Sequence, residues 1–122
     1  MQLAEMVATA SRWIDAYGPN RARDYEAQLW GRVAKVGEEC GEVIAAMIGA
    51  TGQNPRKAVT HTLDDVREEL LDVALTALAA YEHMTDNEGA CIRDLERHVI
   101  KRLRRVGLMP DKAPDGAAEI AG

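Results

Sequence analysis

The sequence predicts an all-α protein with a four-helix bundle-like fold. Apolar residues recur three and four positions apart in four separate segments of the 122-residue chain, which is the spacing of one helix face. No stretch of strand length alternates between apolar and polar residues, and clusters rich in Gly, Pro and Asn separate the segments. Helices with one apolar face pack against each other, so we expect a bundle.

The first two predicted helices occupy residues 3–17 and about 24–48. In the first segment the apolar pattern stops at 18–20, where the sequence reads Gly-Pro-Asn. The second is longer and is ended by Gly49 and Gly52. A loop should then connect it to the third helix.

The third and fourth predicted helices occupy residues 63–84 and about 90–106. Thr62 precedes the third helix as its predicted N-cap, and Asp65 stands at the position that completes a capping box. A turn near residues 86–89 leads to the fourth helix. After it, residues 107–122 carry little apolar pattern, and we expect a flexible C-terminal tail behind one domain at 1–106.

The third helix is apolar on all sides over much of its length. Between Leu70 and Tyr81 the polar side chains are Asp72 and Thr76 alone. Such a helix is normally buried on most of its surface, and we therefore expect Asp72 to be buried and paired. A chain of this size can hardly cover it within one copy, which favours an obligate homo-oligomer.

Composition narrows the class of protein. The chain is 47% hydrophobic and 29% charged, as in ordinary globular proteins, and its net charge of -5 argues against binding to nucleic-acid polymers. It shows neither a signal peptide nor a membrane-spanning run, so we expect a cytoplasmic protein. Cys40 and Cys91 lack metal-ligand spacing and are expected to be reduced core residues.

Two acidic blocks share the pattern E-E-x-x-(E/D), at residues 38–42 and 68–72. Residues three apart lie on one face of a helix. The blocks therefore supply two carboxylate pairs: Glu39 with Glu42, and Glu69 with Asp72. Close carboxylates repel each other strongly when partly buried unless a cation neutralises them. Either block alone is also compatible with a solvated acidic face, but together they favour a metal site if the two helices pack side by side.

Oxygen ligands alone suit a hard cation, Mg²⁺ first and Mn²⁺ as a substitute. A di-iron site of the ferritin type would need Glu-x-x-His on two helices. None of the three histidines has Glu three positions before it. The residue there is Ala58 for His61, Ala80 for His83 and Leu95 for His98. We therefore expect magnesium.

Magnesium readily bridges phosphates, and the predicted fourth helix carries basic residues that suit phosphate oxygens, among them Lys101 and Arg105 on one face. These are equally typical of a solvated helix end. Lys35 shares a face with Glu39, either as a phosphate contact or, more simply, as an ion-pair partner. Trp30, like Trp13, is compatible with stacking on a nucleobase or with a place in the core.

Taken in order, these motifs resemble the MazG-like all-α nucleoside triphosphate pyrophosphohydrolases, over residues from about 30 to 105. The resemblance implies that magnesium is held by four carboxylates: Glu39, Glu42, Glu69 and Asp72. It gives Glu38 a part in holding a metal or positioning water, with Glu38 and Glu39 as the catalytic candidates. It also implies that phosphates contact Lys101 and Arg105, with Arg104 as a further candidate. An asparagine that some members carry near that lysine has no counterpart in this chain.

The function implied by this resemblance is hydrolysis of a nucleoside triphosphate between its α and β phosphates, giving a monophosphate and pyrophosphate. Relatives in that family are dimers or tetramers. Two alternatives stay open: a phosphoribosyl-ATP pyrophosphohydrolase of histidine biosynthesis, and a non-catalytic helical interaction module whose acidic blocks are structural. Neither base nor sugar preference follows from the sequence.

Overall fold

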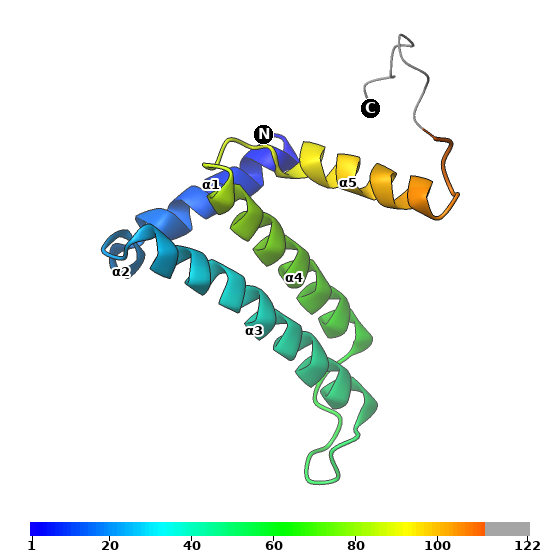
Figure 1. Ribbon diagram of the computed structural model, residues 1–122. Helices are drawn as coiled ribbons and strands as arrows, with labels where there is room; N and C mark the ends of the chain where they lie inside the picture. Colours follow the sequence, from blue (N-terminus) through cyan, green and yellow to red (C-terminus); the bar gives the residue numbers. More distant parts are fainter. Residues whose placement is uncertain (112–122) are drawn as a thin grey trace. The chain divides into compact units, whose positions relative to one another are not determined.

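The computed structural model describes residues 1–111. They form the five helices of Figure 1: α1 (Leu3–Ala16), α2 (Gly18–Arg21), α3 (Tyr25–Thr51), α4 (Leu63–Met84) and α5 (Cys91–Arg105). No strand occurs in this range, and the all-α prediction is confirmed.

The expectation of four helices was wrong by one short element, α2. Its sequence, Gly-Pro-Asn-Arg, was interpreted as a simple helix stop. Pro19 stands at the beginning of α2, where its missing N–H costs nothing and its fixed φ suits a helix start. The Asn20 side chain donates to the carbonyl of Ile14 at 2.9 Å. This bond ties the short helix back to the end of α1.

Helix α3 begins where the sequence predicted and runs three residues further. Asp24 caps its start by accepting a hydrogen bond from the Ala27 amide at 2.8 Å. Gly52 ends it in the left-handed conformation, with φ of 64°. Gly49 lies inside the last turn, and a Cβ there would stand 2.1 Å from Nδ1 of His61. Glycine therefore lets the returning loop pack against the helix end.

Helix α4 has the predicted bounds and the predicted capping box. The Thr62 hydroxyl accepts from the Asp65 amide at 3.2 Å, and the Asp65 carboxylate accepts from the Thr62 amide at 2.8 Å. This second bond lowers the pKa of Asp65. Such a cap is local in sequence, which is why the pattern alone located it.

The chain divides into two compact units, Met1–Ile92 and a second that begins at Arg93. In the first unit, α3 and α4 run antiparallel as a long hairpin, and α1 packs on α4 (Figure 1). The core near this crossing is small: Val7, Ala79 and Cys91. The hairpin and the crossing helix together form the scaffold of the site described below.

The buried face of α1 includes a polar residue. Val7, Ala8 and Ser11 are its buried residues, whereas Trp13 is 72% exposed and Tyr17 58%. The burial of Ser11 is possible because its hydroxyl donates to Oδ1 of Asn87 at 2.5 Å and accepts from Arg32 at 3.1 Å. The aromatic side chains of α1 thus lie on the surface of the single chain.

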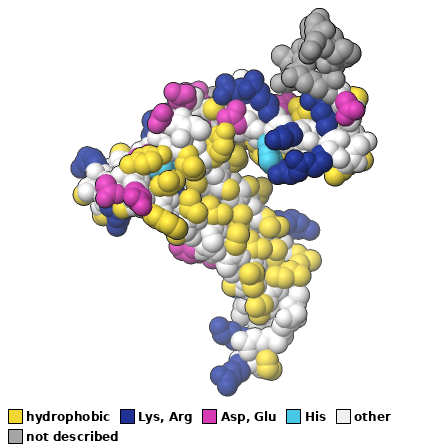
Figure 2. Space-filling model, in the orientation of Figure 1, with side chains coloured by type: hydrophobic (Ala, Val, Ile, Leu, Met, Phe, Trp, Pro, Cys, Tyr) yellow, Lys and Arg dark blue, Asp and Glu magenta, His cyan; other side chains and the backbone are white. Residues whose placement is uncertain are grey.

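Much of the apolar surface of the hairpin is also exposed, and Figure 2 shows hydrophobic side chains along its length. Asp72, expected to be buried, is exposed, and so are Leu71 and Ile44. Cys40 is exposed as well, while Cys91 is buried as predicted. The physical reason is that two antiparallel helices cover only one face of each other, and α1 covers α4 near one end alone.

The second unit contains α5 from Arg93 onward and the turn that ends it. Gly107, with φ of 79°, allows the Leu108 amide to donate to the Leu103 carbonyl at 2.9 Å. Of the predicted flexible tail, residues 112–122 lie outside the described part of the chain. Among residues 1–111, no helix combines the length and apolar character that a membrane crossing requires.

Candidate functional site

Three of the predicted ligands meet between α3 and α4. One carboxylate oxygen from each of Glu39, Glu69 and Asp72 lies within 4.8 Å of the other two. Glu39 and Glu69 are half-buried, and each has an Oε2 atom that is inaccessible to solvent and has no hydrogen-bond partner among the described residues. Asp72 closes the cluster on the solvent side. We refer to these three residues as the acidic cluster.

Lys35 lies beside the acidic cluster. Its ammonium group donates to Oε1 of Glu38 at 3.0 Å and lies 3.4 Å from Oε1 of Glu39. The hydrogen bond to Glu38 is the main cause that raises the pKa of Lys35. The expected ion pair with Glu39 is thus present, and it uses the Glu39 oxygen that is not orphaned. Lys35 offsets part of the negative charge, but it leaves the Oε2 atoms unpaired.

The other predicted site residues lie elsewhere. Glu42 is exposed and is not part of the acidic cluster, and Trp30 is 70% exposed on the surface of α3. Lys101, Arg104 and Arg105 belong to the second unit, whose position relative to the first is not determined. Arg104 donates to the carbonyl of Pro110 at 3.0 Å. The structure therefore brings together three of the four predicted metal ligands.

A cavity of 730 Å³ opens between α1, the α2 segment, α3 and α4. Most of its wall is apolar or small, and its polar lining includes Asp15, Arg23, Gln28, Arg32, Lys35 and Thr76. Lys35 belongs both to this wall and to the surroundings of the acidic cluster. A volume of this size is typical of small-molecule sites.

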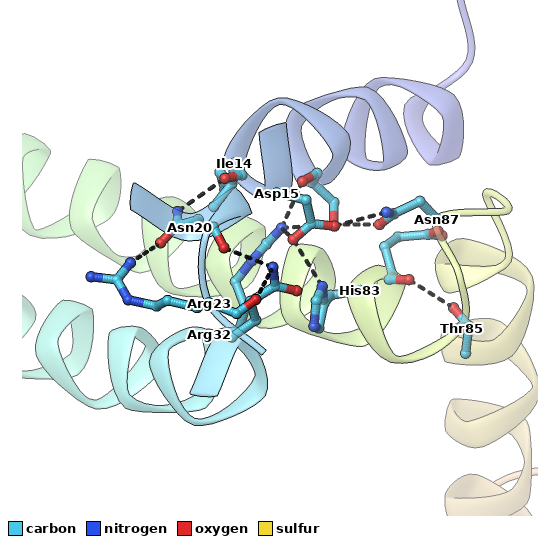
Figure 3. A network of polar contacts seen from close by, with 11 residues as sticks. Ile14, Asp15, Asn20, Arg23, Arg32, His83, Thr85 and Asn87 are labelled. Carbon is cyan, nitrogen blue, oxygen red and sulfur yellow. Dashed lines mark hydrogen bonds and ion pairs between the residues drawn. The ribbon is translucent and has the colours of Figure 1, made fainter. Parts of the chain in front are cut away.

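Asp15 and Arg32 of the cavity lining belong to a polar network that the sequence analysis did not find (Figure 3). Its centre is Asp15, whose Oδ1 accepts from Arg32 at 2.9 Å and lies 2.9 Å from Nδ1 of His83. Its Oδ2 accepts from the side-chain amide of Asn87 at 3.0 Å. Arg32, which is buried, also donates to the Ser11 carbonyl at 2.6 Å. The network joins α1 to α3, to α4 and to the turn after α4.

The titration of Asp15 reflects these contacts. Burial alone would raise the pKa of this carboxyl group, because it disfavours the charged form. Hydrogen bonds from Asn87, Arg32 and His83 outweigh that penalty, and the pKa of Asp15 is lowered from 3.8. Asp15 is therefore an ionised group whose two oxygens both accept hydrogen bonds from within the protein.

A second buried carboxylate, Glu82, caps the start of α5. It is fully buried, and its two oxygens accept from the amides of Gly89 at 2.9 Å and Cys91 at 2.8 Å. A carboxylate at a helix N-terminus is favoured both by these bonds and by the helix dipole. Burial, and then the contact with Glu82, raises the pKa of Cys91 to about 11. The Cys91 thiol is thus kept protonated.

The acidic cluster fits a divalent cation. Its donors are carboxylate oxygens from two helices, which suit Mg²⁺ or Mn²⁺ rather than a softer metal. Two of them are buried without a partner, and an anionic oxygen in that state is costly unless a cation lies nearby. Glu39, Glu69 and Asp72 are therefore the residues that would hold the ion.

Comparison with protein-family models gave no match, and comparison with curated proteins and with solved structures found no significant similarity. The fold and the site define an all-α protein with an acidic cluster on a helix hairpin.

Sequence reasoning missed Asp15, Arg32, Glu82 and Asn87. Most of their partners are distant in sequence: Arg32 is 17 positions from Asp15, and Asn87 is 76 positions from Ser11. Glu82 is the exception, because the amides that it caps are seven and nine positions away. One signal was present: Ser11 and Asp15, four residues apart, put two polar side chains on the helix face that also carries Val7. Such a pair indicates that a buried polar contact has to be satisfied.

Proposed function

We propose that this protein is a magnesium-dependent nucleoside triphosphate pyrophosphohydrolase that releases pyrophosphate and a nucleoside monophosphate. The observation that carries the proposal is the pair of orphaned Oε2 atoms, on Glu39 and Glu69, inside a cluster of three carboxylates. The second support is the cavity, which approaches the cluster at Lys35. A triphosphate held at the cluster would have room for its nucleoside part next to it.

Within this proposal Glu39, Glu69 and Asp72 bind the metal, and Mn²⁺ is a possible substitute. The bound ion would neutralise phosphate charge and lower the pKa of a water ligand. Glu38, exposed beside Glu39, orients or deprotonates the attacking water, with Glu39 as the other candidate base. Glu42 joins the metal site only if its exposed side chain turns toward the cluster.

Cationic side chains stabilise the phosphates. Lys35 is in place, because its ammonium lies next to Glu38 and Glu39. Lys101 and Arg105, with Arg104, are proposed as contacts of the leaving pyrophosphate, supplied by α5 of the same chain or of a second copy. The support for these three is their chemistry and the resemblance of the motif.

The proposal includes self-association through the hairpin. Exposed residues of α3 recur at intervals of three and four, a spacing that forms a seam for a further helix: Trp30, Val33, Gly37, Cys40, Ile44 and Met47. A comparable exposed row occurs on α4: Leu70, Ala74, Ala77, Tyr81 and Met84. Two hairpins that pair along these rows would form a four-helix bundle and cover their apolar side chains.

The decisive experiment measures pyrophosphate release from a panel of nucleoside triphosphates and phosphoribosyl-ATP, with Mg²⁺ and with a chelator. We expect magnesium-dependent release from one or a few of the nucleoside triphosphates. Release from phosphoribosyl-ATP alone would assign the alternative reaction in histidine biosynthesis. An absence of release from every compound would favour the non-catalytic interaction module.

Variants locate the site in the same assay. Glu69→Gln and Asp72→Asn should each abolish release and keep the helical circular dichroism, because each change removes a charge and preserves the size of the side chain. Glu68→Gln is the matched control, since Glu68 is the neighbouring exposed acid outside the acidic cluster. Full turnover in both Glu69→Gln and Asp72→Asn would refute the assignment of the metal ligands.

A further inference from the structure

We propose that the 730 Å³ cavity binds a small molecule that carries one anionic oxygen group, a carboxylate or a phosphate, on an aromatic body. Neither the acidic cluster nor a metal ion takes part, so the site is independent of the proposed function. Three features of the cavity indicate such a ligand: the balance of charges in its wall, the unused hydrogen-bond donors of Arg32, and the apolar remainder of the lining.

The charged side chains in the cavity wall are mostly cationic. Arg23, Arg32 and Lys35 line the cavity, and among the described residues Asp15 is the one carboxylate in the lining. The chain as a whole has the opposite balance, with 20 acidic and 15 basic residues. An excess of positive charge in a concave site attracts anions.

Two of these three cations are paired with carboxylates, and the third is not. Nη2 of Arg32 lies 2.9 Å from Oδ1 of Asp15, and Nζ of Lys35 lies 3.0 Å from Oε1 of Glu38. Arg23 has no ion pair within the described part of the chain. An anionic ligand in the cavity would therefore balance the charge of Arg23.

Arg32 supplies hydrogen-bond donors as well as charge. Its bonds to Ser11 and Asp15 all come from Nη2. Nε and Nη1 have no partner among the described residues, and neither atom is sealed from solvent. Arg32 is 8% exposed and lines the cavity, so we assign this small accessible part to the cavity. A guanidinium N–H that meets an anionic oxygen forms a strong, charge-assisted hydrogen bond.

The rest of the lining suits an aromatic body. Its large apolar side chains are Trp13, Ile14 and Leu75, and small residues leave room beside them: Ala10, Ala27, Gly31 and Ala79. An aromatic ring can stack on the exposed indole of Trp13. Burial of the ring against these side chains adds a hydrophobic contribution that a free inorganic anion lacks.

Isothermal titration calorimetry of the full chain with three naphthalene compounds tests the charge requirement. Naphthoate and naphthamide have nearly the same shape and differ in charge, and naphthyl phosphate carries a phosphate in place of the carboxylate. Without metal, the acidic cluster repels anions and does not compete for them. At least one of the two anions should bind about tenfold more tightly than naphthamide, the effect of one charge-assisted hydrogen bond. The tighter anion identifies the group that the site prefers, and equal affinities of all three compounds would overturn the proposal.

Substitutions of the two arginines test their part in binding. Arg23→Gln removes the unpaired charge and should weaken binding of the anions by about threefold, as for an exposed ion pair. Arg32→Lys keeps a positive charge next to Asp15 but removes the guanidinium N–H groups, and should weaken it further. Affinity for naphthamide should stay the same in both variants. Arg21→Gln is the matched control, because Arg21 is exposed on α2 and lies outside the cavity lining. Wild-type affinity for the anions in both Arg23→Gln and Arg32→Lys would refute the assignment.

A further variant tests the location. Gly31 lines the cavity and has open space where a Cβ would be. Gly31→Leu should fill the cavity and abolish binding of the anions without loss of helix, because leucine favours a helix more than glycine does. Gly41→Leu is the matched control: Gly41 lies on the same helix, with equally open space, outside the cavity. Anion binding that survives in Gly31→Leu would place the ligand outside the cavity and overturn the proposal, whatever the outcome of the pyrophosphate assay.

Discussion

Two polar regions of the first unit differ in how far the oxygens of their carboxylates are hydrogen-bonded. The first region is the network near α1 together with Glu82, which is next to His83 in the sequence. Here Asp15 accepts from three side chains, and Glu82 accepts from two backbone amides. In the acidic cluster, Glu39 and Glu69 each keep a buried oxygen without a partner. The network includes one unpaired atom, Nε2 of His83, but that is a nitrogen of an imidazole ring rather than a carboxylate oxygen.

The difference indicates what each region is for. A carboxylate whose two oxygens both accept hydrogen bonds from the protein stabilises the fold. A buried carboxylate oxygen without a partner costs stability and persists when a cation or substrate repays it. We therefore interpret the network as structural and the acidic cluster as the candidate metal site, and the following variants test that distinction.

The largest expected effect belongs to the network. Glu82→Ala leaves the buried amides of Gly89 and Cys91 without their acceptor and should destabilise the protein by about 2–4 kcal/mol. Urea unfolding followed by circular dichroism measures this loss. Glu88→Ala, in the exposed turn, is the control and should change stability little. Equal stability of the two variants would show that Glu82 is not a structural cap.

The acidic cluster should respond to metal instead. Mg²⁺ at a hundredfold excess over its dissociation constant should stabilise the folded state by about 2.7 kcal/mol, measured as a rise in the midpoint of thermal unfolding. Glu69→Gln should lose this rise, and in the absence of metal it should be no less stable than the wild type, because it removes one of the repelling charges. Glu68→Gln should keep the rise. A rise of equal size in Glu69→Gln would contradict a metal site at the cluster.

The same contrast explains how much the sequence could predict. The capping box of Thr62 and Asp65, and the paired acids of each block, follow from contacts three or four residues apart, which helical periodicity fixes. The meeting of Glu39 with Glu69 required only that neighbouring helices pack as a hairpin. These features were predictable because each depends on local geometry and one simple packing rule.

The remaining features depend on long-range contacts and on partial burial. Asp15 meets Arg32, His83 and Asn87 through the angle at which α1 crosses α4, and no local pattern encodes that angle. Asp72 was expected to be buried because its helix is apolar, but one hairpin leaves the outer side of that helix uncovered. Glu42 was grouped with Glu39 by spacing alone, whereas the structure leaves its side chain exposed.

A smaller effect should appear at acid pH. The lowered pKa of Asp15 means that its contribution to stability is complete above the unfolded-state pKa of 3.8 and is lost as the pH falls through the lower folded-state value. Asp15→Asn should therefore cost about 1–2 kcal/mol at pH 7 and show a shallower loss of stability below pH 4. Urea midpoints measured between pH 7 and pH 3 test this. Asp64→Asn, a change on the exposed face, serves as the control and should keep the wild-type slope.

The last prediction concerns the rate at which a thiol reagent modifies the two cysteines, one in each region, and involves no change in stability. Cys91 is buried beside Glu82 with a pKa of about 11, so a thiol reagent at pH 8 should modify it only when the protein unfolds. Cys40, next to Glu39, is exposed in the single chain but lies in the row of α3 proposed to face a second copy. Its modification should therefore slow as the protein concentration rises, and Ile44→Lys, which puts a charge into that row, should remove the dependence on concentration. If Cys40 is modified rapidly at every protein concentration, the row of α3 next to the acidic cluster is not a subunit interface. If Cys91 is modified rapidly in the folded protein, the region around Glu82 is accessible to solvent and the burial of Cys91 is contradicted.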